Sequence, residues 1–217
     1  MYKHPKIDRD KITPSEALDL LTEGNQRFIH NVKRQHDMLS VRDEIKDKQH
    51  PFASILGCSD SRTTVELIFD QNLGDLFSVR LAGNIASREA IGSLEFSCKQ
   101  LGSKIIVVMG HSNCGAIKAA CEGYKGGNLG EIIKLIEPAV EAEKSVSDKE
   151  KRNAQNDLFV EKVCFLNIRK QIERILYLSP IINEMVNNKK IAIVGGVYSL
   201  SSGLFEIDSE NSILSQL

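Results

Sequence analysis

The chain has 217 residues, with 28 basic and 29 acidic side chains and 41% hydrophobic residues. This length and apolar content suit one large domain with a continuous core, and no run of like charge is long enough to follow a nucleic-acid backbone or a lipid surface. The apolar runs are too short to cross a bilayer, and the N-terminus carries no secretory signal. Five irregularly spaced cysteines fit a reducing compartment better than a disulfide framework. We therefore expect a cytoplasmic protein, unless an export segment has been removed, with no nucleic-acid or membrane partner.

The first predicted element is a helix that opens with a capping box at Thr13-Pro14-Ser15-Glu16. Its apolar stripe is predicted to be buried against the sheet or against a partner subunit. The stripe consists of Leu18, Leu21, Phe28 and Val32. A second helical pattern covers residues 38–48, so residues 1–50 are expected to form an N-terminal helical arm.

The remaining residues, 51–217, are predicted to form an α/β core that completes a single domain over 1–217. Strands are predicted at 52–57, 76–80, 105–109 and 191–194, and helices at 64–69, 87–101, 113–122, 129–144, 153–177 and after Pro180. This alternation favours a mainly parallel central sheet flanked by helices, with the very apolar strand 105–109 in the middle. Alternating residues around a turn at 202–203 predict a C-terminal hairpin at the edge of the sheet.

Two short segments at strand ends carry the candidate chemistry. Cys58-Ser59-Asp60-Ser61-Arg62 and His111-Ser112-Asn113-Cys114 each follow a short apolar run. Because parallel sheets place their sites at the carboxyl ends of the strands, we expect the two segments to meet. Two thiols and one imidazole suit a zinc ion with one position left for water or a carboxylate. A single cysteine or histidine in such a place is more often a core residue, so the combination carries the prediction.

Asp60 and Arg62 are close enough in the chain to form a bidentate ion pair. Beside a metal ion the carboxylate has two possible positions. It can occupy the fourth ligand position and close the site, or it can pair with Arg62 and leave that position open.

With both segments in view, the chain resembles a β-class carbonic anhydrase of the bacterial type over residues 17–207. The resemblance is carried by E-A-L-x-x-L-x-x-G-N-x-R-F in the first helix, C-S-D-S-R, residues 69–77, residues 80–84, G-H-S-N-C-G-A, residues 167–169 and residues 194–198. The pairing of C-S-D-S-R with H-x-x-C is highly specific to that family.

The resemblance implies one zinc ion per subunit, held by Cys58, His111 and Cys114. Asp60 and Arg62 would control the fourth position, with Asp60 as the fourth ligand in a closed state. The implied reaction is the reversible hydration of carbon dioxide to bicarbonate and a proton, by attack of zinc-bound hydroxide. Two thiolates neutralise the charge of the metal, so activity should favour alkaline pH. The implied assembly is a homodimer or a dimer of dimers.

Members of this family also orient carbon dioxide with a glutamine and apolar side chains, partly from a neighbouring subunit. Gln49, Phe77 and Ala82 match these positions, and Phe96 stands where many relatives carry tyrosine. Ile55 replaces the tryptophan of members that bicarbonate regulates, so we do not expect regulation of that form.

The other histidines and cysteines are assigned to lesser roles. His50, beside Gln49, is considered as a proton shuttle. The remaining histidines, His4, His30 and His36, are assigned to the surface or to an interface, and the cysteines Cys98, Cys121 and Cys164 to packing.

Two alternatives to carbon dioxide hydration are left open. One is the hydrolysis of carbon disulfide or carbonyl sulfide on the same scaffold. The other is a non-catalytic, zinc-stabilised interaction protein.

Overall fold

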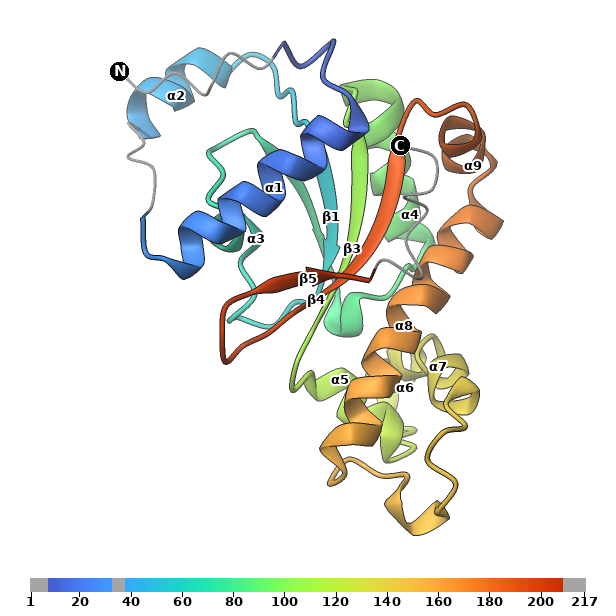
Figure 1. Cartoon of the computed structure of the whole chain (residues 1–217). Helices are drawn as coiled ribbons and strands as arrows, with labels where there is room; N and C mark the ends of the chain where they lie inside the picture. Colours follow the sequence, from blue (N-terminus) through green and yellow to red (C-terminus); the bar gives the residue numbers. More distant parts are fainter. Residues whose placement is uncertain (1–7, 33–37, 209–217) are drawn as a thin grey trace.

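A five-stranded sheet of order β2-β1-β3-β4-β5 forms the centre of the protein in the computed structural model (Figure 1). The structure describes residues 8–32 and 38–208. The strands are β1 Ala53–Gly57, β2 Leu76–Arg80, β3 Ile105–His111, β4 Ala192–Tyr198 and β5 Phe205–Ile207. The first four strands are parallel, and β5 pairs antiparallel with β4. The predicted mainly parallel sheet, its central strand and its edge hairpin are thus confirmed.

Helices cover both faces of this sheet. They are α1 Pro14–Ile29, α2 Met38–Ile45, α3 Val65–Ile68, α4 Arg88–Glu95, α5 Gly115–Cys121, α6 Gly127–Lys134, α7 Glu137–Ala142, α8 Asp157–Leu178 and α9 Pro180–Asn187. Side chains from α1 and α3 pack on one face, and side chains from α4, α8 and α9 pack on the other. Because β1 and β3 are covered on both faces, they are buried along their whole length, which explains their unbroken apolar sequence.

A third apolar cluster lies beyond the carboxyl ends of the strands. It is formed by α5, α6, α7 and the first half of α8, which Figure 1 shows below the sheet. Cys58 and Cys114 belong to this cluster, so the candidate ligands lie between the sheet and these helices.

The predicted capping box of α1 is present, but the predicted apolar stripe extends beyond the end of the helix at Ile29. The Thr13 side chain accepts a hydrogen bond from the Glu16 backbone, and the Glu16 carboxylate accepts one from the Thr13 backbone N–H at 2.8 Å. Leu18 and Leu21 are buried, whereas Val32 lies beyond the helix and is 65% exposed. The helix ends earlier because Asn31 adopts a left-handed backbone conformation, with φ at 54°.

Three further helices have bounds that differ from the prediction. The pattern at 38–48 is helical only to Ile45, and the helix expected from 153 begins at Asp157. The predicted helix 129–144 is two helices, because Pro138 stands in the first turn of α7 and cannot continue α6. Across 8–32 and 38–208, none of the helices combines the length and the apolar character that crossing a membrane requires.

Candidate metal centre

Cys58, His111 and Cys114 meet where β1 and β3 end. Their ligand atoms all lie within 4.8 Å of one another, and the two sulfur atoms are 3.9 Å apart. The two strands are neighbours in register, with Gly57 opposite Met109, so the residues that follow them arrive at the same edge of the sheet. All three side chains are buried, with exposures of 5%, 1% and 2%. The structure brings together the three residues that the sequence predicts as ligands.

The imidazole of His111 is oriented for a metal ion. Its Nδ1 donates a hydrogen bond to the Ser112 carbonyl oxygen at 2.9 Å, which leaves the lone pair on Nε2. This Nε2 is buried and has no hydrogen-bond partner among residues 8–32 and 38–208. A buried polar atom without a partner costs free energy, and a bound cation would remove that cost. Two cysteines and a histidine with a free nitrogen form a donor set that fits zinc.

The two thiols share a hydrogen bond that governs their ionisation. It lowers the pKa of Cys58, with support from His111 and from the backbone N–H of Gly83, 3.4 Å from the sulfur. The same hydrogen bond, together with burial, raises the pKa of Cys114. The lowered pKa favours the thiolate form of Cys58, which is the form that binds a metal ion.

Asp60 and Arg62 form the predicted bidentate ion pair. The Arg62 Nε and Nη2 atoms donate to the two carboxylate oxygens at 2.9 and 2.7 Å, and the Arg62 backbone N–H donates at 2.9 Å. These hydrogen bonds hold the pKa of Asp60 well below its usual range. The carboxylate Oδ2 lies 3.9 Å from the Nε2 of His111, and Asp60 is not part of the three-ligand group. The structure thus contains the open arrangement, and the closed state with Asp60 as a ligand stays a prediction.

Residues that the sequence analysis gave no role hold this loop in place. Arg80 donates from Nε to the Cys58 carbonyl oxygen at 3.0 Å and from Nη2 to the Asp60 carbonyl oxygen at 2.6 Å. The buried Asn167 of α8 donates to the Gly83 carbonyl oxygen at 2.9 Å. In the sequence, Arg80 could have been noticed as an arginine at a strand end, and Asn167 as an asparagine on the buried face of a helix.

The four predicted substrate-binding residues divide into two groups. Ala82 directly precedes Gly83, whose N–H contacts the Cys58 sulfur. Phe77 instead pairs with Ser54, near the start of β1, and the four steps along the chain from Ser54 to Cys58 span about 13 Å of extended chain.

Phe96 lies beside Phe77, and Gln49 precedes the amino end of β1. Gln49 is exposed and precedes β1, so it lies further from Cys58 than Ser54 does. Phe96 is 46% exposed, and its ring centroid is 6.2 Å from that of Phe77. Within one chain, the structure does not bring Gln49, Phe77 and Phe96 to the ligands.

His50 also precedes β1, and its Nε2 lies 3.4 Å from an Asp10 carboxylate oxygen. His50 is therefore not at the carboxyl end of β1 in its own chain, and its role as a proton shuttle stays a prediction. Of the other histidines, His30 is exposed, and His4 and His36 lie outside the described residues.

Three further cysteines are buried, as the packing assignment predicts. Burial raises the pKa of Cys98 and of Cys164 to about 12 and that of Cys121 to about 11, so all three are neutral thiols. Cys164 lies next to the site, with its sulfur 3.5 Å from the His111 carbonyl oxygen, but it is not part of the three-ligand group.

Comparisons with known proteins agree with this geometry. The carbonic anhydrase family model matches residues 53–205. Carbonic anhydrase 2 of Mycobacterium tuberculosis is 33% identical over 197 residues, which cover 88% of this chain and 90% of that protein. The carbonic anhydrase of Mycolicibacterium smegmatis is 30% identical over 202 residues, covering 90% and 94%.

Solved structures show the same fold. A tetrameric β-carbonic anhydrase of Sordaria macrospora is 25% identical, with a TM-score of 0.66 over 77% of this chain and 85% of that one. A β-carbonic anhydrase of Aspergillus fumigatus has a TM-score of 0.70 over 90% of both chains at 22% identity. The chain therefore belongs to the β-class carbonic anhydrases, the lyases that hydrate carbon dioxide.

Proposed function

We propose that the protein hydrates carbon dioxide reversibly to bicarbonate and a proton, at a zinc site formed by Cys58, His111 and Cys114. The observation that carries the proposal is the buried three-ligand group, whose imidazole has a free Nε2, beside the Asp60–Arg62 ion pair. A zinc ion held there would act as a Lewis acid that makes water acidic enough to supply hydroxide near neutral pH.

Asp60 is proposed to orient the attacking oxygen. Because Arg62 holds its pKa low, the carboxyl group stays ionised and can only accept hydrogen bonds. Its Oδ2 lies near the metal ligands, 3.9 Å from the His111 Nε2. An acceptor in this place favours an oxygen that carries a hydrogen, such as water, hydroxide or the protonated oxygen of bicarbonate.

The closed state requires Asp60 to leave Arg62. The short separation from His111 supports this movement, because a small rotation would bring the carboxylate toward the metal position. In that state Asp60 would be the fourth ligand and would exclude water.

We propose that Gln49, Phe77 and Phe96 act on the site of a second subunit, while Ala82 acts in its own. The support is their location in their own chain. The sheet register keeps Phe77 away from Cys58, Phe96 lies beside Phe77, and Gln49 precedes β1, with Phe96 and Gln49 both exposed. Carbon dioxide is apolar, so phenylalanine rings are suitable walls for its pocket. The smallest complete assembly is then a homodimer, and a dimer of dimers extends it.

The test of the function is stopped-flow hydration of carbon dioxide by the wild type and Asp60→Asn, over about pH 6 to 9. Since the Asp60 pKa lies far below this range, the carboxyl group does not titrate in it, and the wild-type rate should rise with pH as hydroxide forms. In Asp60→Asn we expect kcat/KM to fall about 100-fold with zinc content unchanged.

Asp19→Asn on the exposed side of α1 is the matched control, because it makes the same chemical change far from the site. Equal rates for Asp60→Asn and the wild type would remove Asp60 from the mechanism.

The same assay addresses the two alternatives. Faster turnover of carbonyl sulfide than of carbon dioxide would favour the sulfur-gas hydrolase. Absence of hydration at every pH, in protein loaded with zinc, would favour the non-catalytic role. The cytoplasmic location stays a prediction of the sequence.

A further inference from the structure

A cavity of about 390 Å³ reaches two of the three candidate ligands. It lies among α5, α8 and the β4–β5 hairpin, and both His111 and Cys114 line it. Neither Asp60 nor Arg62 lines it, so it is separate from the side of the site to which we assign the reaction. The His111 imidazole is 1% exposed, and its Nε2 has no partner among the described residues.

Among the described residues, the charged side chains that line the cavity are all acidic. They are Asp157 and Glu161 of α8 and Glu206 of β5, each an exposed residue. Asp157 is partly offset by Lys118, whose Nζ is 3.9 Å away and hydrogen-bonded to Asn113. Neither glutamate has an ion pair with any residue in 8–32 or 38–208. Around the opening, Glu161 and Glu206 therefore contribute negative charge that no ion pair within the described residues offsets.

The other side of the site lacks such an excess of negative charge, because its carboxylate Asp60 is paired with Arg62. The Arg62 guanidinium is 56% exposed beside Asp60, and Arg80 donates to the same loop. A divalent cation that approached from there would meet the paired Asp60 and Arg62 and the nearby Arg80, so this loop offers no unpaired carboxylate to attract it.

We propose that the acidic cavity is the route by which the metal ion enters its site. Glu161 and Glu206 attract the hydrated cation to the opening, and the thiolate and imidazole ligands at the inner end bind it more tightly than carboxylates do. The hydroxyl groups of Ser112, Ser199 and Ser201 also line the cavity and can replace waters lost on the way. A route is needed because none of the three ligands is more than 5% exposed. This inference rests on the proposed zinc site.

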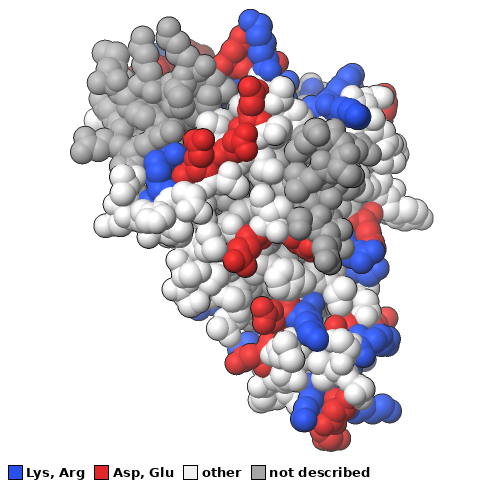
Figure 2. Space-filling model, viewed as in Figure 1, with Lys and Arg blue, Asp and Glu red and all other residues white. Residues whose placement is uncertain are grey.

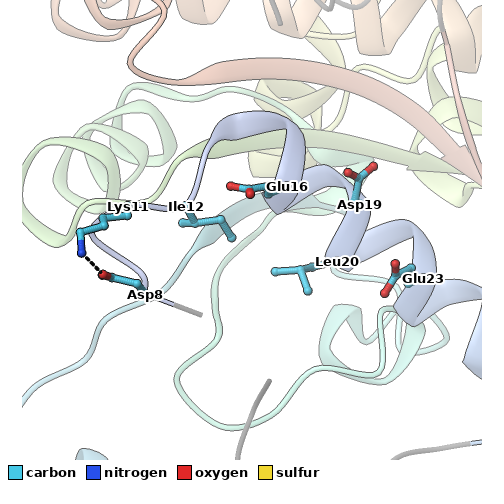
Figure 3. A pocket seen from close by; sticks show the side chains of 7 residues that line it. All are labelled: Asp8, Lys11, Ile12, Glu16, Asp19, Leu20 and Glu23. Atoms are coloured by element: carbon cyan, nitrogen blue, oxygen red, sulfur yellow. Dashed lines mark ion pairs between the residues drawn. The ribbon is translucent and has the colours of Figure 1, made fainter. Parts of the chain in front are cut away.

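A second acidic hollow, on α1, provides the matched control. It has a volume of about 440 Å³ and is lined by the carboxylates of Asp8, Glu16, Asp19 and Glu23 (Figure 3). Lys11 pairs with Asp8 at 2.9 Å, and none of the described residues that line this hollow is a cysteine or a histidine. Figure 2 shows acidic side chains both over α1 and over β5, on the same face of the molecule. Acidity alone thus does not distinguish the two places, but access to the ligands does.

The experiment is the uptake of Co²⁺ by metal-free protein, followed in a stopped-flow instrument by the thiolate-to-cobalt charge-transfer absorption. We expect the double variant Glu161→Gln/Glu206→Gln to take up the ion about 5-fold more slowly than the wild type at low salt. The double variant Asp19→Asn/Glu23→Gln removes the same charge from the α1 hollow and should take up the ion at the wild-type rate. The final absorbance should be equal in all three proteins, because the ligands are unchanged.

Salt dependence is the second measurement. At about 1 M salt the screening length is about 3 Å, so the difference between the wild type and Glu161→Gln/Glu206→Gln should disappear. Equal uptake rates at low salt, or an equal slowing in the α1 control, would overturn the entry route.

The entry route and the proposed function can fail separately. If the uptake rates are equal while the zinc-loaded protein still hydrates carbon dioxide, only the entry route is wrong. If no charge-transfer absorption appears in any variant, the zinc site itself is wrong, and the entry route is wrong with it.

Discussion

The thiol of Cys58 is positioned by a chain of buried hydrogen bonds. The Gly83 N–H points to the sulfur, Asn167 donates to the Gly83 carbonyl oxygen, and Gln171 donates to the Asn167 side chain at 2.9 Å. Gly83 has a φ of 71°, which favours glycine, and an added Cβ would lie 2.6 Å from Ile136. Because Asn167 and Gln171 are fully or almost fully buried, water cannot replace these hydrogen bonds. Outer partners of this kind fix the orientation of a metal ligand.

Asn167→Asp tests this series of hydrogen bonds by changing a single side-chain amide to a carboxylate. The substitution keeps the acceptor for Gln171 but replaces the donor to Gly83 with a carboxylate oxygen that repels the carbonyl group. We expect zinc affinity to fall about 10- to 100-fold and the metal-free protein to lose about 1–3 kcal/mol of stability. Chelator competition and urea unfolding measure the two effects.

Asn128→Asp, an exposed position on α6, is the control and should change neither quantity appreciably. Unchanged zinc affinity in Asn167→Asp would mean that the Gly83 loop does not depend on α8.

At the scale of elements, α1 connects parts of the fold that are far apart in sequence. The Asn25 side chain donates to the carbonyl oxygens of Ile68 and Gly203 at 3.1 and 2.9 Å and accepts from the Phe205 backbone at 2.8 Å. Gly24 permits this close approach, because a Cβ there would lie 1.8 Å from the Phe69 carbonyl oxygen. The G-N pair of the first-helix motif therefore joins α1 to both α3 and the C-terminal hairpin.

Gly24→Ala should separate α1 from α3 and lower the free energy of unfolding by about 3 kcal/mol, since the added methyl group meets backbone that cannot rotate away. Gly92→Ala on α4 is the matched control, because nothing lies within 4 Å of the added Cβ. In a helix interior alanine is better than glycine, so this variant should gain about 0.5–1 kcal/mol. Urea unfolding of both variants gives the comparison, and equal stabilities would show that the contact at Gly24 is not restrictive.

At the scale of the whole molecule, the parallel sheet keeps two sets of predicted site residues at opposite ends of its strands. Cys58 follows the carboxyl end of β1, whereas Gln49 precedes its amino end. Because β1 is an extended strand of five residues, it holds Gln49 and Cys58 apart, and one chain cannot bring both to the same site. The proposed function then requires a second subunit to supply Gln49 to each zinc site.

Mixed oligomers of Cys58→Ser and Gln49→Ala subunits test this dependence. If Gln49 acts across the interface, each variant alone should be nearly inactive, and a mixed dimer should recover about half of the wild-type rate at its one complete site. The measurement is carbon dioxide hydration by dimers purified through two different tags.

Pairing the wild type with the double variant Cys58→Ser/Gln49→Ala is the inverse control, because its only zinc site would lack Gln49 and should be nearly inactive. Half activity in this control, with none in the first mixture, would place Gln49 in the site of its own chain.

The sequence by itself determined the features that depend on near neighbours in the chain. Apolar runs identified β1 and β3, the capping box set the start of α1, and residue type together with position after a strand identified Cys58, His111 and Cys114. These signals are local, because hydrogen bonding within one turn and burial of one strand involve adjacent residues.

Only the tertiary structure decided the features that depend on contacts between distant segments. Sheet register placed Phe77 away from Cys58, and packing of α8 against the loop after β2 gave Asn167 its role. The open Asp60–Arg62 pair, which the sequence left undecided, is likewise a result of the loop conformation that Arg80 holds. The physical reason is that strand order, register and the burial of polar groups are set by the packing of the whole chain, which local sequence patterns do not contain.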